Sequence, residues 1–274
     1  MSWWEAIFLG LLQGFTEFLP VSSSGHLVIF QHVFQVPQPG VTFEVMVHIG
    51  TMFSVIIVFW KDLVDLFQGL FSKGPSSRGL ASNRDQKRLF VLLLAGTVVT
   101  GLIGVILGPF LKGLFQKPIV TGFMLLVTGF IVFAITRMSS LPGKKDTSEL
   151  SIWDGVFVGA CQGVAIIPGI SRSGTTIFAA LFRGMDRKTA IKYSFLLSLP
   201  AIGGAALLEA LELFRGGSIP DGFFVYVVAA ILAFVSGVFA IKVFINFLNQ
   251  GKFHYFSYYC WFAGSFTILY FLVI

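Results

Sequence analysis

Long apolar segments separated by short polar connections make up most of the chain. A helix needs about twenty apolar residues to cross a hydrocarbon core of about 30 Å. The segments that meet or approach this length are residues 41–60, 89–108, 119–137, 191–210, 222–247 and 258–274. The pattern therefore predicts an all-α integral membrane protein with six membrane-crossing helices.

Two further apolar stretches do not fit as simple crossings, because polar residues, proline and glycine interrupt them. Residues 1–36 are broken at PVSSSGH, residues 20–26, and residues 153–185 are broken at PGISRSG, residues 168–174. Non-helical backbone at membrane depth is tolerated only where it is buried in protein or lines a water-filled cavity. Each stretch is therefore expected to form a re-entrant broken-helix hairpin that enters and leaves the membrane on one side.

The two broken stretches repeat each other at a constant offset of 149 residues. LGLLQG at residues 9–14 aligns with VGACQG at residues 158–163, and SSSG at residues 22–25 aligns with SRSG at residues 171–174. Three predicted crossings follow each motif. Because three is odd, the second copy would be inserted upside down relative to the first. This is the inverted-topology plan, in which broken helices build a site near the membrane midplane.

The repeat predicts a division of the chain into two halves. Residues 1–137 are expected to form the first repeat, with the hairpin 1–36 and three crossings. A cytoplasmic linker is expected at residues 138–152. Residues 153–274 are expected to form the second, inverted repeat, with the hairpin 153–185 and three crossings.

Composition excludes the soluble classes. Only 12% of the residues are charged, whereas a soluble domain has about 25%. The two cysteines lie inside apolar stretches, which excludes a disulfide scaffold or a cysteine-rich metal site. The net charge of +6 comes from basic residues in short connections, so we expect no nucleic-acid partner and take these charges as a topology signal.

The distribution of lysine and arginine predicts the orientation. Of the 19 basic residues, Lys112, Lys117 and Arg215 fall on one side, Arg172 lies in the second broken loop, and all others fall on the opposite side. Because cytoplasmic loops carry the excess of positive charge, both termini are predicted to be periplasmic. The first basic residue after the initiator methionine is Lys61, so no cleavable signal peptide is expected.

The two broken loops carry the candidate chemistry. Serine hydroxyls, backbone N–H groups and half-helix N-termini would favour an anion, and phosphate suits them. The hydroxyls belong to Ser22, Ser23, Ser24, Ser171 and Ser173. Between them, Arg172 offers a planar, permanently charged group that matches phosphate oxygens.

Titratable side chains surround the first loop. Glu17 lies in an apolar stretch, where a carboxylate is costly and is a functional candidate by default. Gln13 precedes Glu17 by one helical turn, and His26 follows the serines. A carboxylate, hydroxyls and an imidazole are the groups that activate a nucleophile or transfer a proton to a leaving group. The structural alternative is that Glu17 and His26 only hydrogen-bond the broken backbone and that Arg172 only neutralises Glu17.

Glu44 and His48 are weaker candidates. They lie one turn apart in the first crossing and either line the cavity or pair with each other in helix packing. An apolar groove beside the site would suit a long lipid tail.

With both loops defined, the chain resembles the bacterial undecaprenyl-diphosphate phosphatase family of the bacitracin-resistance type over essentially its whole length. The motifs that carry the resemblance are QGFTEFLPVSSSGH at residues 13–26 and PGISRSGTT at residues 168–176. The resemblance implies hydrolysis of undecaprenyl diphosphate to undecaprenyl phosphate and inorganic phosphate. This step recycles the carrier lipid for peptidoglycan synthesis and confers bacitracin resistance. The resemblance also implies a location in the bacterial cytoplasmic (inner) membrane, a site open to the periplasmic side, and Mg²⁺ or Ca²⁺ as cofactor.

The resemblance also implies roles for individual residues. Glu17 is implied as the essential acid or metal-linked carboxylate, Ser23 as the nucleophile, His26 as its proton-transfer partner and Arg172 as the diphosphate clamp. Ser171 and Thr176 are implied as supporting phosphate donors. The family's first motif begins with Glu or Gln, and the glutamine here, Gln13, could add an amide oxygen to an octahedral Mg²⁺ shell that keeps several waters.

Several alternatives stay open at the level of sequence. Either Ser23 attacks to give a phosphoserine, or His26 or Glu17 activates a water. A transporter or flippase of a polyprenyl phosphate lipid would use a similar fold, because inverted repeats with broken helices are common in transporters. The expected partners are a polyprenyl diphosphate substrate and membrane lipids, and a homodimer is left open.

Overall fold

A computed structural model describes residues 1–35, 40–71, 83–138, 145–214 and 222–273. These residues form helices, with a single parallel bridge between Lys145 and Met185 and no strand. The helices are α1 (Trp3–Phe18), α2 (Ser23–Val33), α3 (Gly40–Val58), α4 (Trp60–Phe71), α5 (Asn83–Leu111), η1 (Lys112–Leu114), α6 (Pro118–Met138), η2 (Thr147–Glu149), α7 (Ile152–Val164), α8 (Arg172–Phe182), α9 (Arg187–Phe214), α10 (Phe223–Asn249) and α11 (His254–Val273).

The six predicted crossings correspond to α3, α5, α6, α9, α10 and α11. Among the described residues, the last five are each long and apolar enough to cross a membrane. A sixth crossing results if α3 and α4, which are bent by 75° at their junction, count as one span. The protein is therefore an all-helical, multi-pass membrane protein.

Helix α4 lies in the segment between the predicted crossings 41–60 and 89–108, where the hydropathy pattern predicts no helix. One side of it packs on α5, where Leu66 and Gly69 are buried and Gly69 lies against Gln86. Asp62 forms an ion pair with Lys192 of α9 at 2.6 Å. The sequence window was too polar to indicate a crossing, but one apolar face is enough for a surface helix.

The two breaks predicted in the apolar stretches are confirmed. Helix α1 ends at Phe18, and Leu19 has an extended backbone because the following Pro20 disfavours the α conformation. Ser22 and Ser171 then cap the N-termini of α2 and α8, accepting hydrogen bonds from the backbone N–H groups of Gly25 and Gly174. The predicted linker, residues 138–152, lies partly outside the described residues, which lack 139–144.

Each broken stretch folds back on itself as a helical hairpin. In the first, the ring of Phe8 in α1 contacts Phe30 in α2 at 5.1 Å between centroids. In the second, Asp154 at the start of α7 is buried and accepts a hydrogen bond from Arg183, just past α8, at 2.6 Å. Lys145 lies 3.4 Å from the same carboxylate. The beginning and the end of each stretch are therefore close together.

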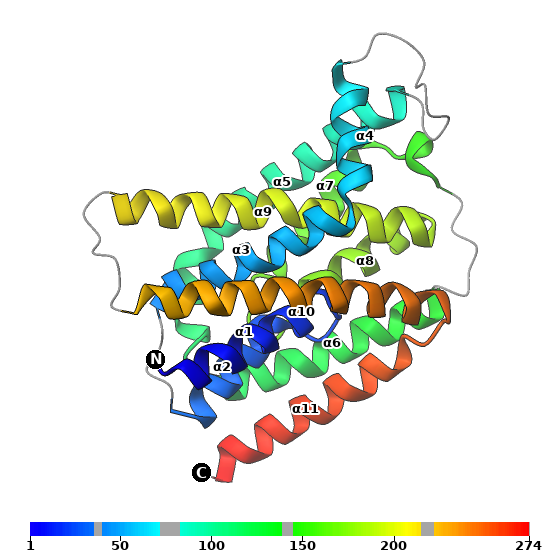
Figure 1. Ribbon diagram of the computed structural model, residues 1–274. Helices are drawn as coiled ribbons and strands as arrows, with labels where there is room; N and C mark the ends of the chain where they lie inside the picture. The colour runs from blue at the N-terminus through cyan, green and yellow to red at the C-terminus, as the bar shows by residue number, and fades with distance from the viewer. Residues whose placement is uncertain (36–39, 72–82, 139–144, 215–221, 274) are drawn as a thin grey trace.

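Close helix contacts fall at equivalent glycines of the two halves. Helix α1 packs on α10, and α7 packs on α5, while α3 packs on α9 and α6 on α11. A Cβ on Gly10 would lie 2.5 Å from the carbonyl oxygen of Ala229, and a Cβ on Gly159 would lie 2.3 Å from that of Gly96. Small residues of this kind let membrane helices approach closely. Both termini lie at one end of the helices, and the turn between α10 and α11 lies at the other (Figure 1).

The glycine contact gives a prediction for stability. We expect Gly159→Ala to lower the thermal unfolding midpoint of the purified protein by roughly 3–8 °C, because the added methyl group meets the backbone of Gly96. The matched control is Gly101→Ala on α5, where a Cβ would meet nothing within 4 Å. That change is expected to leave the midpoint unchanged or higher, since alanine is the better helix former. Equal behaviour of the two variants would contradict the packing.

Candidate active site

The two broken loops meet in the interior of the protein. A Cβ on Gly25 would lie 3.0 Å from the Cα of Gly169, and one on Gly174 would lie 3.3 Å from the Cβ of Pro20. Each loop therefore touches the first helical turn that follows the other loop. The contacts are reciprocal, so the N-termini of α2 and α8 are brought to one place.

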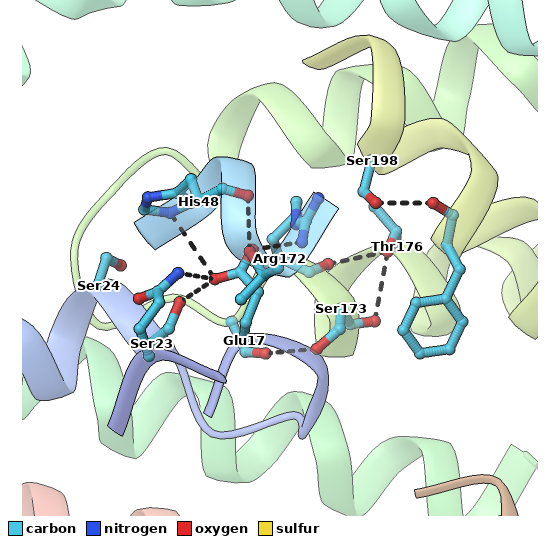
Figure 2. A network of polar contacts seen from close by, with 12 residues as sticks. Glu17, Ser23, Ser24, His48, Arg172, Ser173, Thr176 and Ser198 are labelled. Atoms are coloured by element: carbon cyan, nitrogen blue, oxygen red, sulfur yellow. Dashed lines mark hydrogen bonds and ion pairs between the residues drawn. The ribbon is translucent and has the colours of Figure 1, made fainter. Parts of the chain in front are cut away.

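The carboxylate of Glu17 is the centre of the polar contacts at this place (Figure 2). Its Oε1 accepts a hydrogen bond from Nη2 of Arg172 at 2.5 Å, which is also an ion pair between the two loops. Its Oε2 accepts from Nε2 of Gln13 at 2.8 Å and from the hydroxyl of Ser23. The side chain of Glu17 is only 4% exposed, so these partners replace the water that a carboxylate would otherwise bind.

His48 of α3 points toward the same carboxylate (Figure 2). Its Nε2 lies 3.7 Å from Oε2 of Glu17, and its Nδ1 donates to the carbonyl oxygen of Glu44 at 2.6 Å. Four helices, α1, α2, α3 and α8, thus place polar groups around the carboxylate of Glu17.

A cavity of about 360 Å³ opens beside these groups. Its polar wall includes Glu17, Arg172 and His48 together with the three consecutive serines of the first loop. Much of the remaining wall is apolar and comes from α2, α3 and α9 and from the segments that follow α5 and α7. The apolar wall residues are Leu27, Val45, Phe115, Ala165, Ile166, Ile170, Ala201, Ile202, Ala205 and Ala206. Such a cavity fits a ligand with an anionic head and an apolar tail.

Arg172 has a nitrogen available for such a head. Its Nη1 is buried and has no hydrogen-bond partner among the described residues, while Nη2 is used by Glu17. Ser22 and Ser171, which cap the two helices, both line the cavity, and so does Ser24. The arrangement resembles the helix N-terminal sites that bind phosphate through backbone N–H groups.

Not every predicted residue lies on the cavity. The hydroxyl of Ser173 donates to the carbonyl oxygen of Leu19, which joins the loops from behind. Thr176 is buried and bonds to the hydroxyl of Ser194 at 2.5 Å. Gln13 is fully buried and reaches the cavity only through Glu17.

The structure does not bring His26 to the cavity. Its Nδ1 donates to the carbonyl oxygen of Ser22 at 2.8 Å, and its Nε2 lies 2.6 Å from the hydroxyl of Tyr259 on α11. Both ring nitrogens are therefore engaged with groups other than Ser23. Ser22 itself has φ 68° and ψ 94°, a conformation that costs a non-glycine residue about 1–3 kcal/mol.

Four polar cavity residues lie outside the set that the motifs indicate. They are Glu44, His48, Thr100 and Gln162. For Glu44 and His48 the sequence leaves cavity lining and helix packing open, and the structure places both on the cavity. Gln162 aligns with Gln13 at the offset of 149, so the repeat held a signal for it. Thr100 belongs to no motif and gave no signal of this kind.

Comparisons with known proteins show the family of the chain. The sequence model described as bacitracin resistance protein BacA matches residues 6–266. The chain is 41% identical over 278 residues to the undecaprenyl-diphosphatase of Desulforapulum autotrophicum, with 98% of each chain covered. It is 41% identical over 269 residues to that of Halothermothrix orenii, again with 98% of each covered. It is 43% identical over 272 residues to the undecaprenyl-diphosphatase of Desulfosudis oleivorans. That alignment covers 96% of this chain and 97% of the relative.

The buried ion pair gives a prediction that does not depend on activity. We expect Arg172→Met to reduce the free energy of unfolding by about 3 kcal/mol, because it leaves the Glu17 carboxylate without its main counter-charge. Adding Glu17→Gln should recover most of the loss, since the remaining buried group is then neutral. Thermal or denaturant unfolding in detergent measures both, with Arg137→Met, an exposed arginine of α6, as the control. Simple addition of the two single losses would refute the coupling.

Proposed function

The chain belongs to the bacitracin resistance protein BacA family, and from this premise we propose that it is an undecaprenyl-diphosphatase. It would hydrolyse the terminal phosphate of undecaprenyl diphosphate to give undecaprenyl phosphate and inorganic phosphate. The observation that carries the proposal is the contact of Glu17 with both Ser23 and Arg172 at the point where the loops meet. A hydroxyl, a carboxylate that can take its proton and a cation for phosphate oxygens are then within one cavity.

The substrate would lie with its diphosphate on the polar wall and its first isoprene units on the apolar wall. Nη1 of Arg172, the serine hydroxyls and the N-terminal N–H groups of α2 and α8 would bind the terminal phosphate. In the phosphoryl-transfer transition state, charge spreads over the equatorial oxygens, so donors that are fixed in place stabilise it. The lipid tail would contact apolar side chains of α3 and α9 in the cavity wall.

Ser23 would act as the nucleophile. Glu17 takes the proton of the Ser23 hydroxyl as the Oγ–P bond forms. The bridging P–O bond breaks with its electron pair on undecaprenyl phosphate, and Glu17 passes the proton to that oxygen. Water then attacks the phosphoserine, and Glu17, again a carboxylate, takes a proton from the water. Glu17 returns this proton to the Oγ of Ser23 as the Oγ–P bond breaks and inorganic phosphate leaves. Because Glu17 already accepts the hydrogen bond of Ser23, no rearrangement precedes the first step. Activation of water by Glu17, without a phosphoserine, is the competing mechanism.

His26 would act on this reaction through the loop. The resemblance implies that His26 exchanges protons with Ser23, and that role stays a prediction that requires the ring to leave Ser22 and Tyr259. In the arrangement described above, His26 instead holds the backbone that places Ser23 beside Glu17.

The reciprocal packing supports an inverted repeat. Helices α1 and α7 pack on α10 and α5, and equivalent glycines make the contacts. We propose that residues 1–137 and 153–274 are the two repeats and that both hairpins are re-entrant. With the charge distribution, this arrangement would put both termini in the periplasm and open the site to the periplasmic side of the bacterial inner membrane.

A divalent cation, Mg²⁺ or Ca²⁺, would fit beside the carboxylate. Glu17 supplies one hard oxygen ligand, and Oε1 of Gln13 is a buried acceptor with no partner among the described residues. The described part of the chain holds no group of three or more His, Cys, Asp or Glu side chains suited to a metal. Waters and diphosphate oxygens would therefore complete the coordination shell of the cation. When bound, the cation would neutralise charge on the diphosphate.

The function is tested by phosphate release from undecaprenyl diphosphate in detergent with Mg²⁺. We expect release by the wild type and losses of more than about a hundredfold in Ser23→Ala, Glu17→Gln and Arg172→Ala, because each removes a group that acts in the transition state. Arg137→Ala serves as the control and should stay within about twofold of the wild type.

Acid quenching during turnover should trap phosphoserine at residue 23. Activity in Ser23→Ala with loss in Glu17→Gln would favour activated water, and a wild type that binds the lipid without release would favour a lipid transporter.

The cation is tested by chelation. We expect EDTA to abolish phosphate release and added Mg²⁺ or Ca²⁺ to restore it, because the diphosphate charge is otherwise only partly neutralised. Gln13→Ala should raise the Mg²⁺ concentration that gives half-maximal release, since it removes an oxygen ligand. Gln86→Ala, which changes a buried glutamine beside α4, is the control. Full activity in EDTA would refute the proposal.

A further inference from the structure

Tyr259 of α11 lies behind the loop that holds Ser23, on the side away from the cavity lining. Its hydroxyl is 2.6 Å from Nε2 of His26, and the two rings stack at 5.6 Å between centroids with their planes 8° apart. Tyr259 as a residue is 44% exposed, and its hydroxyl is the part that reaches the buried His26.

The direction of the hydrogen bonds follows from the chemistry of the carbonyl group. The carbonyl oxygen of Ser22 can only accept, so Nδ1 of His26 carries the proton and donates to it at 2.8 Å. In the neutral ring, Nε2 then accepts a hydrogen bond from the hydroxyl of Tyr259. The Ser22 carbonyl therefore fixes the tautomer of His26, and Tyr259 holds the ring in the orientation that reaches this carbonyl.

The loop that these bonds hold has an unfavourable conformation. Ser22 has φ 68°, in the left-handed region, and it immediately precedes Ser23. The equivalent Ser171 of the second loop has φ −73° and ψ 118°, an ordinary extended conformation. A strained residue persists only where its surroundings determine it, so the first loop needs a support that the second does not.

The second loop also lacks the support. Thr175 occupies the position of His26 at the offset of 149, and its hydroxyl is buried without a hydrogen-bond partner among the described residues. The residue after Tyr259 adds a second contact to the first loop, because the thiol of Cys260 donates to the carbonyl oxygen of Pro20 at 3.5 Å. Helix α11 thus contacts the first loop at two points, on either side of Ser22.

We propose that Tyr259 is a positioning residue for the nucleophile: through His26 and the Ser22 carbonyl it holds Ser23 against Glu17. The inference rests on the proposed function, and it adds α11 to the elements on which the chemistry depends. A hydroxyl displaced by about 1 Å loses much of the advantage of a bound, oriented nucleophile, whereas diphosphate binding by Arg172 is unaffected.

The test is Tyr259→Phe, which removes one oxygen atom and keeps the ring on His26. In the detergent assay with undecaprenyl diphosphate and Mg²⁺, we expect kcat to fall about tenfold or more while KM stays within about twofold. Tyr258→Phe is the matched control, because Tyr258 is the neighbouring, exposed tyrosine whose ring contacts His254 and Trp261. It should retain wild-type kcat, and all variants should share the wild-type unfolding midpoint.

A second measurement follows the path through His26. In protein with ¹⁵N-labelled histidine rings, the His26 signal is identified by its loss in His26→Asn. Tyr259→Phe should shift the Nε2 resonance of His26, and Tyr258→Phe should not. Wild-type kcat in Tyr259→Phe, a change in KM alone, or an unshifted His26 resonance would each overturn the inference. No phosphate release by the wild type would instead refute the proposed function, and the inference with it.

Discussion

The ion pair between Glu17 and Arg172 is the interaction on which the architecture depends. A carboxylate and a guanidinium lie in the apolar interior, 155 residues apart in sequence, and each compensates the desolvation of the other. Neither loop would hold its charged group at this depth alone. The pair therefore joins the two halves of the chain at the place where the chemistry is proposed, and stability and function rest on the same contact.

The broken helices explain why such a pair exists at all. Interrupting α1–α2 and α7–α8 leaves backbone N–H groups without helical partners, and the serine caps satisfy some of them. The N–H groups that remain, with the helix dipoles, favour an anion between the loops. Arg172 neutralises Glu17 with one nitrogen and leaves another for a phosphate oxygen, so the resting site is balanced in charge without being closed to substrate.

The two loops differ at positions that align at the offset of 149. The positions are equivalent, but the first loop has Glu17, a strained Ser22 and a histidine where the second has Ile166, an extended Ser171 and a threonine. The second loop contributes the cation and hydrogen bonds that hold the loops together. The carboxylate and the imidazole thus belong to the first loop, and the second supplies the positive charge and a supporting hydrogen bond.

The sequence alone determined the class of the protein, the positions of the long helices, the two breaks and the residues at their meeting point. Hydropathy, proline and serine patterns act locally, so the long helices and the two breaks could be predicted from neighbouring residues. Helix α4 was missed because a single apolar face among charges gives no crossing signal. Only the tertiary structure decided which way each side chain points. It placed His48 of α3 beside Glu17, turned His26 away toward Tyr259 of α11, and put Thr176 behind the cavity wall. These contacts join residues tens to hundreds of positions apart, and no local pattern encodes the packing that brings them together.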